Sequence, residues 1–354
     1  MEHAPRILAV GRALPPHFAD QEALIAAFAE HWQKHHFNLE RLAALHRATQ
    51  VGGRHLALPV AEYARLTGFA ERNAAFQRVG AEVGEEAVRN GLSRAGLKPG
   101  DVDHLFFVTV TGVSTPSLDA RLMNRLGFGP RVKRTPIFGL GCVAGAAGLA
   151  RASDALRAYP GQVAVLLSVE LCSLTLQAED ASVANIIATG LFGDGAAAAV
   201  LTGGAHPRRS GPRILATRSV FYPETEWVMG WEVIDSGFKV VLSAEVPRVV
   251  EEHIGGDVDA FLAEQGLTRD RIRHWIAHTG GPRVLEAFRT ALDLPREAIA
   301  RSFRSLQEIG NLSSASVLFV LGDLLDAAEA REGDLGILAA MGPGFSSELL
   351  LLAW

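Results

Sequence analysis

Short apolar runs alternate with longer amphipathic stretches along most of this chain. Apolar runs of about four to eight residues, bounded by Gly, Pro, Asn or Asp, are typical of buried strands. Such runs predict strands at residues 7–10, 104–111, 135–140, 163–170, 196–201, 214–220, 238–242, 272–277, 336–341 and 347–352. Apolar positions three and four residues apart predict helices at residues 21–31, 75–95, 118–126, 143–158, 246–265, 283–292 and 313–329.

This order of elements predicts an α/β protein. Strands separated by helical stretches indicate a parallel sheet that is covered by helices. The last two strands are separated by Gly342-Pro343-Gly344 and are predicted to form a hairpin. Glycine supplies unusual backbone angles in such a turn, and proline fixes one dihedral angle.

The chain also contains a diffuse internal repeat. Residues 102–112 and 272–280 both run from a strand into a Thr-Gly pair that precedes a helix. At nearly the same offset, about 170 residues, residues 141–146 correspond to residues 310–315. Two correspondences in one register predict a duplicated α/β unit, because a single one would be expected by chance.

The repeat divides the chain into two similar halves and places chemistry in each. We expect an N-terminal half at residues 1–205 that carries Cys142, and a C-terminal half at residues 206–354 that carries His278 and Asn311. Cys142 and Asn311 would then occupy equivalent helix starts that face the centre of the molecule.

Cys142 stands where an apolar strand ends in glycines and a helix of small residues begins. The unpaired N–H groups and the dipole of a helix N-terminus favour the thiolate form of a cysteine. His278 and Asn311 follow the same kind of strand–loop–helix junction. Cysteine, histidine and asparagine at such junctions indicate acyl transfer through a thioester.

With these residues in this order, the chain resembles the thiolase superfamily and, within it, the type III polyketide synthases, which are chalcone-synthase-like enzymes. The segments that carry the resemblance are residues 139–145, 169–175, 192–197, 275–282, 310–315 and 341–344. The family's Gly-Phe-Gly-Pro-Gly turn reads Ala-Met-Gly-Pro-Gly at 340–344, and its His-Pro-Gly-Gly-Pro loop reads His-Thr-Gly-Gly-Pro at 278–282. The resemblance implies a thiolase-like duplicated architecture of five layers, α-β-α-β-α.

The resemblance also implies a role for each of the three reactive residues. Cys142 would be the nucleophile that accepts the starter acyl group from an acyl-CoA. His278 would be the imidazolium partner of the thiolate, and Asn311 would help it bind the thioester oxygen of malonyl-CoA while CO₂ is lost. The structural alternatives are a buried thiol, a hydrogen-bonded core histidine and a helix cap.

Further positions are implied by the same resemblance. Phe192 would separate the coenzyme A tunnel from the cavity, and Thr115 would cross a homodimer interface into the partner's pocket. The other residues implied to line the cavity are Cys172, Thr175, Trp231, Phe238 and Ser313. Cations for the coenzyme A phosphates are expected among Arg41, Arg47, Arg54 and Arg283. Core packing and solvated surface charge are the respective structural alternatives.

Composition narrows the classes of function. A net charge of -5 and a hydrophobic content of 48% indicate a globular enzyme and give no reason to expect a nucleic-acid partner. Cys142 and Cys172 are the two cysteines, so no disulfide framework is expected, and the compartment is expected to be a reducing cytoplasm. Neither a signal peptide nor an apolar run of about 18 residues is found, so no membrane span is expected.

Two motifs suggest cofactors that we do not expect. Residues 139–145 resemble a dinucleotide-binding loop, but the glycine spacing and the required acidic residue are missing. His31, His35 and His36 lie on one predicted helix, but no third ligand accompanies them, so no metal site is expected. Coenzyme A thioesters are therefore expected as substrates, with no bound cofactor.

The starter and the product stay open at this point. Ala144, Gly145, Ala188 and Gly190 leave room for an alkyl chain, which favours a fatty acyl starter and an alkylpyrone or alkylresorcinol product. Malonyl-CoA as its own starter is the alternative, because Cys172 resembles the pocket cysteine of some bacterial enzymes that form tetrahydroxynaphthalene or phloroglucinol.

Two other functions share the same three residues. An initiating β-ketoacyl-carrier-protein synthase would use carrier-protein thioesters, and a silent thiolase-like subunit would only hold acyl chains. The Gly-Gly-Pro after His278 and the Gly-Pro-Gly hairpin favour the polyketide synthase over the first alternative, and the intact Cys-His-Asn set argues against the second.

Overall fold

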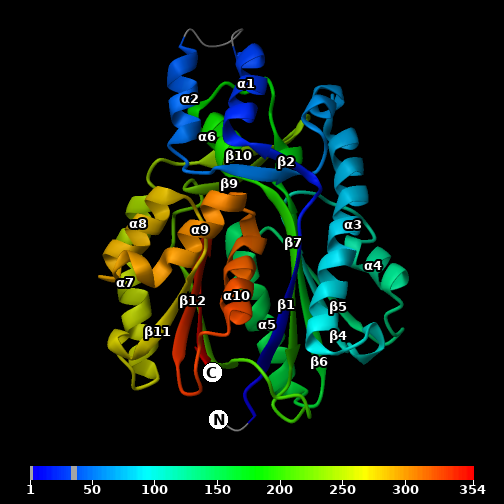
Figure 1. Cartoon of the computed structure of the whole chain (residues 1–354), viewed down its shortest axis with the longest axis vertical. Helices are drawn as coiled ribbons and strands as arrows, with labels where there is room; N and C mark the ends of the chain where they lie inside the picture. The colour runs from blue at the N-terminus through cyan, green and yellow to red at the C-terminus, as the bar shows by residue number, and fades with distance from the viewer. Residues whose placement is uncertain (1–2, 33–37) are drawn as a thin grey trace.

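The computed structural model describes residues 3–32 and 38–354. His35 and His36 lie outside the described residues, as does the side chain of His31. Within the described part, one large mixed sheet is surrounded by helices on both faces (Figure 1).

The sheet consists of two parts that meet at its middle. The N-terminal part has the strand order β5-β4-β6-β7-β1, and the C-terminal part continues as β8-β13-β12-β11. Its strands are β1 (Arg6–Ala13), β4 (His104–Thr109), β5 (Lys133–Phe138), β6 (Val163–Leu171), β7 (Asp194–Thr202), β8 (Arg213–Phe221), β11 (Ile272–Ala277), β12 (Leu335–Gly342) and β13 (Ser346–Ala353). The two parts are joined by a single residue pair, Arg6 with Arg213.

Strand directions repeat between the two parts. The pairs β4–β6 and β11–β12 are parallel, β6–β7 and β12–β13 are antiparallel, and so are β7–β1 and β13–β8. The duplicated unit predicted from the sequence is therefore present. The sheet is mixed rather than purely parallel, because each half closes with an antiparallel strand after its parallel pair.

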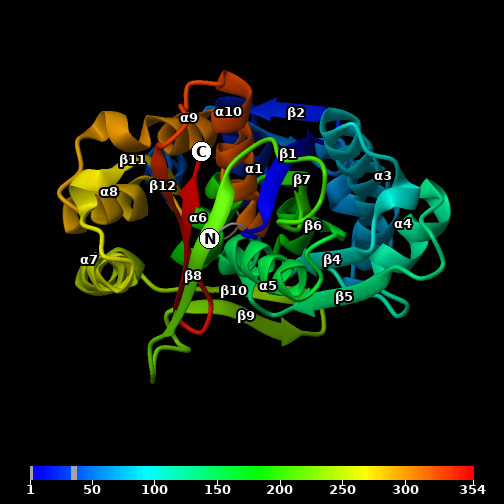
Figure 2. The same cartoon turned by 90° about the horizontal axis from the view of Figure 1, so that it is seen from below.

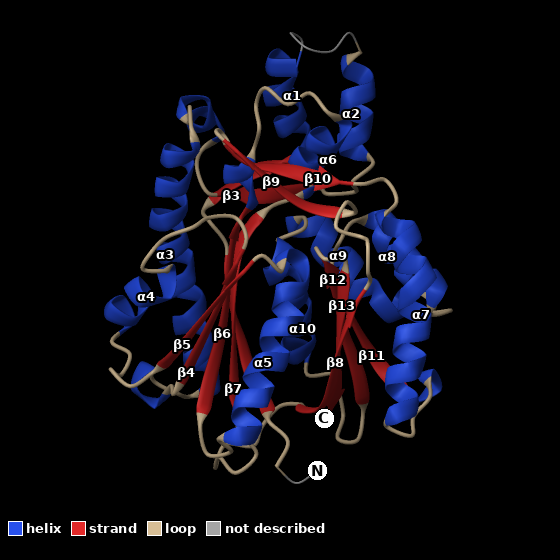
Figure 3. Ribbon diagram, turned by 180° about the vertical axis from the view of Figure 1, so that it is seen from behind, coloured by secondary structure: helices blue, strands red, loops and turns tan. Residues whose placement is uncertain are grey.

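Helices complete five layers, as predicted (Figure 3). In the middle layer, α5 (Ala144–Ala158) and α10 (Ser316–Ala327) lie between the two sheet parts. The helices α3 (Phe69–Ala95) and α4 (Leu118–Leu126) cover the outer face of the N-terminal part. The helices α7 (Val246–Glu264) and α8 (Pro282–Ala291) cover the outer face of the C-terminal part, as the view from below also shows (Figure 2).

Small residues let the central helices approach each other closely. A Cβ atom at Gly145 in α5 would lie 2.2 Å from the carbonyl oxygen of Ser314 and 2.9 Å from a methyl group of Val317. Most of α5 is buried, as expected for a helix that is covered by sheet on two sides. The starts of α5 and α10 therefore meet at the centre of the molecule.

Smaller elements gather at one end of the sheet, which is drawn at the top of Figure 1. They are β2 (His17–Asp20), α1 (Gln21–Trp32), α2 (Leu39–Arg47), β3 (Gly53–Leu56), α6 (Val183–Leu191), β9 (Met229–Ile234), β10 (Gly237–Leu242) and α9 (Ala300–Ile309). The sequence pattern did not predict β2, β3, β9, α2, α6 or α9. Their short length and, in α6, a glycine and β-branched residues weaken the helical or strand signal.

Helical turns of three to six residues complete the described elements, at residues 60–65, 99–101, 141–143, 172–175, 269–271, 296–299 and 313–315. The helix predicted at 313–329 thus begins as a tight turn that continues into α10. Among the described residues, no helix combines the length and apolar character needed to cross a bilayer.

Candidate active site

Cys142 lies in the turn at residues 141–143, between the end of β5 and the start of α5. Gly141 has a φ of +53°, and a Cβ atom there would lie 2.8 Å from the ring of Pro343. A Cβ atom at Gly342 would lie 2.6 Å from the backbone nitrogen of Val143. The turn between β12 and β13 thus packs directly against the loop that holds the thiol, and both contacts require glycine.

The Cys142 thiol is buried, with 5% of the residue exposed, and its Sγ lies 3.7 Å from Ser313 Oγ. Burial raises the pKa of Cys142 to about 12, although hydrogen bonds from Ser313 and Asn311 act in the opposite direction. The negative charge of Glu170 raises this pKa further. In this structure desolvation therefore outweighs the thiolate-stabilising effect that was expected from the helix N-terminus.

Asn311 occupies the equivalent helix start in the second half. Its Oδ1 accepts hydrogen bonds from the backbone N–H of Ser313, at 2.8 Å, and from Ser316 Oγ, at 3.2 Å. Because a backbone N–H can only donate, the amide oxygen is fixed on this side and the NH₂ group is left to donate elsewhere. The Asn311 side chain thus caps the following turn and also lowers the pKa of Cys142 slightly, against the effect of burial.

Phe192 lies beside Asn311 through backbone contacts. The N–H of Asn311 donates to the carbonyl of Leu191 at 2.9 Å, and the N–H of Gly193 donates to the carbonyl of Asn311 at 2.9 Å. Phe192 and Asn311 form an isolated parallel bridge. The predicted gate and the predicted oxyanion donor are therefore held in fixed register.

His278 directly follows β11, and its backbone N–H donates to Ala339 at 3.0 Å. The residue is 8% exposed, and neither ring nitrogen has a hydrogen-bond partner among the described residues. Met341 and Phe345 help to form a small apolar hollow around it. Burial lowers the pKa of His278 to about 4, which favours the neutral imidazole, and its role as an imidazolium partner of the thiolate stays a prediction.

A buried carboxylate whose charge acts on Cys142 was not identified from the sequence. Glu170, at the end of β6, accepts hydrogen bonds from the Ser314 hydroxyl, from Thr111 Oγ1 at 2.9 Å and from the N–H of Val110 at 3.1 Å. Burial raises the pKa of Glu170 to about 7. One signal was available in the sequence, because Glu170 interrupts an otherwise apolar strand.

A cavity of about 560 Å³ lies nearby, and Cys142, His278 and Asn311 are not among the residues that line it. Four of the predicted cavity residues line it, namely Cys172, Thr175, Phe192 and Trp231. Phe238 packs behind Trp231, with their ring centres 6.2 Å apart. Of the other predicted positions, Ser313 lies next to Cys142, and Thr115 is exposed in the loop between β4 and α4.

The four predicted coenzyme A residues have different surroundings. Arg54 lines the cavity, but the residue is 2% exposed and its guanidinium donates to protein oxygens. Arg41 is exposed on α2. Arg283 is exposed at the start of α8, beside a hollow of about 440 Å³ whose wall also includes Ala48 and Gln50.

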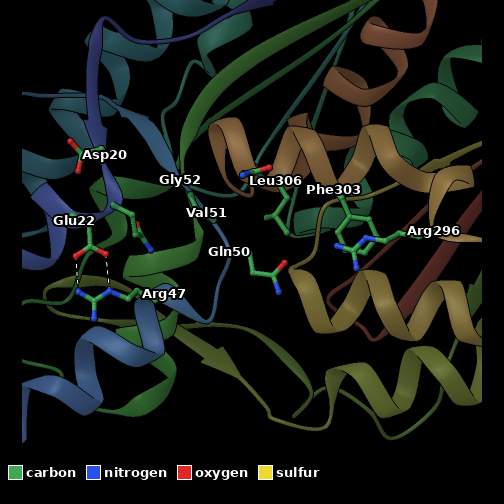
Figure 4. Close-up of a pocket in the computed structure, with 11 residues that line it drawn as sticks. Asp20, Glu22, Arg47, Gln50, Val51, Gly52, Arg296, Phe303 and Leu306 are labelled. Carbon is green, nitrogen blue, oxygen red and sulfur yellow. Dashed lines mark hydrogen bonds and ion pairs between the residues drawn. The ribbon is translucent and has the colours of Figure 1, made fainter.

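Arg47 lies in a second hollow of about 550 Å³, between the N-terminal helices and α9 (Figure 4). Its guanidinium forms two hydrogen bonds of 2.7 Å with the carboxylate of Glu22. On the other side of this hollow, Arg296 lies over the ring of Phe303 at 4.3 Å. Both hollows include Gln50, so they are neighbours along one surface.

A resident metal ion has no evident ligand set here. Among residues 3–32 and 38–354, no three His, Cys, Asp or Glu side chains gather closely enough to hold one.

Comparisons with known proteins agree with this geometry. The family model for the N-terminal domain of chalcone and stilbene synthases matches residues 2–207, and the model for their C-terminal domain matches residues 213–353. The chain is 49% identical to 1,3,6,8-tetrahydroxynaphthalene synthase of Streptomyces peucetius, over 100% of this chain and 94% of that protein. It is 33% identical to phloroglucinol synthase of Pseudomonas fluorescens, over 96% of each.

A solved structure is similar over the same length. The crystal structure of 1,3,6,8-tetrahydroxynaphthalene synthase from Streptomyces coelicolor, a bacterial type III polyketide synthase, superimposes with a TM-score of 0.93. The identity is 32%, and the match covers 99% of each chain.

Proposed function

Because this chain belongs to the chalcone and stilbene synthase family and is a type III polyketide synthase, we propose that it builds a polyhydroxylated aromatic product from malonyl-CoA alone. The observation that carries this proposal is the 49% identity, over the whole chain, to a tetrahydroxynaphthalene synthase. This choice favours malonyl-CoA as starter over the fatty acyl starter that small residues in the sequence suggested.

The cavity wall is mainly apolar and also carries polar side chains, namely Tyr63, Cys172, Thr175, Gln177, Asn185 and Ser236. Most of these polar groups already hydrogen-bond protein atoms. The lining alone therefore does not choose between a poly-β-keto chain and an alkyl chain. A volume of about 560 Å³ lies within the range of small-molecule sites, about 300–1,000 Å³.

We propose that Cys142 starts the first cycle by attacking the thioester carbonyl of malonyl-CoA, and each later cycle by attacking that of the extended chain on coenzyme A. A C–S bond forms to Sγ, and coenzyme A leaves as its thiol with the proton from Cys142. The NH₂ group of Asn311 and the His278 ring then bind the thioester oxygen of the next malonyl-CoA while its carboxylate leaves as CO₂. The resulting carbanion attacks the acyl-cysteine, a C–C bond forms, and the Cys142 sulfur leaves.

We assign the nucleotide end of coenzyme A to the hollow beside Arg283. Arg283 is exposed beside this hollow and follows His278 by five residues in the sequence, so its guanidinium is open to a bound anion. Arg47 is already paired with Glu22. Arg283→Ala is expected to raise KM for malonyl-CoA and to leave kcat within about twofold. An unchanged KM would contradict the assignment.

We also propose that the enzyme is a homodimer that pairs through β5. This strand is at the edge of the sheet, and its residues are largely exposed. Lys133, Arg134 and Pro136 oppose strand-to-strand pairing at this edge, but Phe138 at its end is apolar and 54% exposed, and we expect this side chain to contact the second copy. Light scattering should give twice the chain mass, and Phe138→Lys should shift the protein towards monomer. A monomeric wild type would refute this assembly.

The test of function is incubation with labelled malonyl-CoA alone and with added acyl-CoAs from acetyl to palmitoyl. An aromatic product from malonyl-CoA alone would support the proposal. Products that carry the added acyl chain would instead support the fatty acyl starter. That second function is favoured by one observation, the apolar arm of the cavity at Leu24, Ala27, Val60 and Leu66.

A further inference from the structure

The last turn of α6 ends inside the protein, where its carbonyl groups have no partners within the helix. The carbonyl oxygen of Gly190 lies 2.5 Å from Arg54 Nη1. The same oxygen lies 3.0 Å from Gln21 Nε2 and 3.1 Å from Thr49 Oγ1. Arg54 Nη2 also donates to the carbonyl of Thr189. Donors from three separate N-terminal segments therefore converge on the end of one helix.

Arg54 is the central member of this group. Its guanidinium spans two consecutive carbonyls, and Nη1 also donates to Gln21 Oε1 at 2.9 Å. Burial lowers its pKa to about 10, while the charge of Asp194 acts in the opposite direction. A planar, charged fork suits this bridge, which a single ammonium group could not reproduce. Buried and engaged in this way, Arg54 is not available to a coenzyme A phosphate.

The turn that Arg54 holds leads directly to the reactive group. Leu191 and Phe192 follow Gly190, and both sides of Phe192 are hydrogen-bonded to the backbone of Asn311. The two backbones are closely packed here, because a Cβ atom at Gly310 would lie 2.8 Å from the carbonyl oxygen of Leu191. A shift of the α6 end would therefore move the gate and the oxyanion donor together.

We propose that Arg54 is a positioning residue for the condensation, which it serves by fixing Phe192 at the cavity and Asn311 beside Cys142. The inference rests on the proposed use of malonyl-CoA, because Asn311 acts on the thioester oxygen of that substrate. Loading of Cys142 depends less on this register than decarboxylation does. A misplacement of about 1 Å at a reacting group can cost up to about 100-fold in rate.

The test compares Arg54→Met with Arg157→Met. Arg157 is a matched control, because it also donates to two consecutive carbonyls, those of Ile214 at 2.8 Å and Leu215 at 2.9 Å. It lies near the C-terminal end of α5, at the opposite end of that helix from Cys142.

Two quantities are measured for each protein. Intact mass gives the fraction of Cys142 that is acylated by malonyl-CoA. The rate of CO₂ release is then divided by this fraction, so misfolded protein does not lower the calculated rate. Arg54→Met is expected to load within about twofold of wild type and to release CO₂ about tenfold more slowly per loaded site. Arg157→Met is expected to keep the wild-type rate per loaded site.

A malonyl thioester of N-acetylcysteamine, which lacks the nucleotide, separates positioning from phosphate binding. The positioning role predicts the same loss of CO₂ release with this substrate. A defect that appears only as a raised KM for malonyl-CoA would make Arg54 a phosphate ligand and overturn the inference. An unchanged rate per loaded site in Arg54→Met would overturn it as well, and would leave Arg54 a structural residue.

Gln21→Met keeps the inference testable if Arg54→Met does not fold. It removes one of the donors to Gly190 and is expected to lower CO₂ release per loaded site by about two- to threefold. No change would count against the inference. If wild type releases no CO₂ from either thioester, the proposed use of malonyl-CoA fails, and this inference fails with it.

Discussion

The same connection of the duplicated unit is built differently in the two halves. In the N-terminal half, β6 and β7 are joined by residues 172–193, which include α6, Cys172 and Phe192 and form much of the cavity wall. In the C-terminal half, β12 and β13 are joined by residues 343–345, which pack against the loop of Cys142. The duplicated framework sets where the reactive groups lie, and the longer connection provides the space for substrate.

A second contrast concerns what precedes the two central helices. Strand β5 leads to Cys142, whereas helix α9 leads to Asn311. Both residues nevertheless follow a glycine with positive φ, +53° at Gly141 and +75° at Gly310. The local turn, rather than the element before it, therefore decides that each side chain faces the centre.

The largest effect is expected from removing the nucleophile of the first half. Cys142→Ala should form no acyl adduct by intact mass and should lose product formation by a factor on the order of 10⁴ or more. Cys172→Ala should still gain one acyl group. A Cys142→Ala protein that still forms product would contradict the assignment of Cys142 as the nucleophile.

Removing the donor of the second half should affect a different step. Asn311→Leu is expected to keep the acyl adduct on Cys142 and to slow CO₂ release from malonyl-CoA by about 10²–10³-fold, as for loss of one oxyanion donor. Stopped-flow or radiometric CO₂ release, compared with intact mass, checks this. If Asn311→Leu lost loading and CO₂ release in equal proportion, loading could not be assigned to the first half and decarboxylation to the second.

The short connection of the C-terminal half can be tested through its packing. Gly342→Ala would place a Cβ atom 2.6 Å from the backbone nitrogen of Val143, so the backbone must shift. We expect a loss of about 1–3 kcal/mol in the free energy of unfolding. Gly100→Ala is the control, because a Cβ atom there would have no neighbour within 4 Å. Equal stability of both variants in urea would contradict this account.

An effect of similar size, confined to a change of pH, concerns the buried carboxylate of the first half. The raised pKa of Glu170, about 7, means that the unfolded chain ionises first as pH rises from about 4.5. Stability from Glu170 is therefore present below pH 4.5 and is lost by pH 7. Glu170→Gln should reduce the fall in unfolding free energy between pH 5 and pH 8 by up to about 2.5 kcal/mol. Exposed Glu82→Gln should leave that fall unchanged, and an unchanged fall in Glu170→Gln would contradict the assignment.

Much of the fold could be predicted because it depends on long periodic segments. The buried strands β4, β6 and β7 and the helices α3, α5 and α7 carry strong apolar patterns, and the five-layer order is confirmed. Helix α6 was missed because its stability comes from partners far away in sequence, including Arg54. No local pattern could indicate such a cap.

The candidate site was predictable in its residue types but not in its electrostatics. The glycine-flanked Cys142 and Asn311 mark their turns in the sequence, and the structure brings both side chains together. Burial of Cys142 and His278 depends on how the two halves close around them, and this burial shifts both pKa values towards the neutral forms, which the sequence could not indicate. Arg54 could not be told from a surface arginine, because only the tertiary contacts bury it.

The middle layer has a consequence for how such a chain could have arisen. Strands β1 and β8 share only one residue pair, so the sheet itself hardly joins the halves. The apolar surfaces of α5 and α10 do, because they form a single core with strands of both sheet parts. An ancestor with only one half would have exposed one face of its central helix to water. A single half would therefore need a second copy to cover this face, and two like halves in one chain supply that cover without a second subunit.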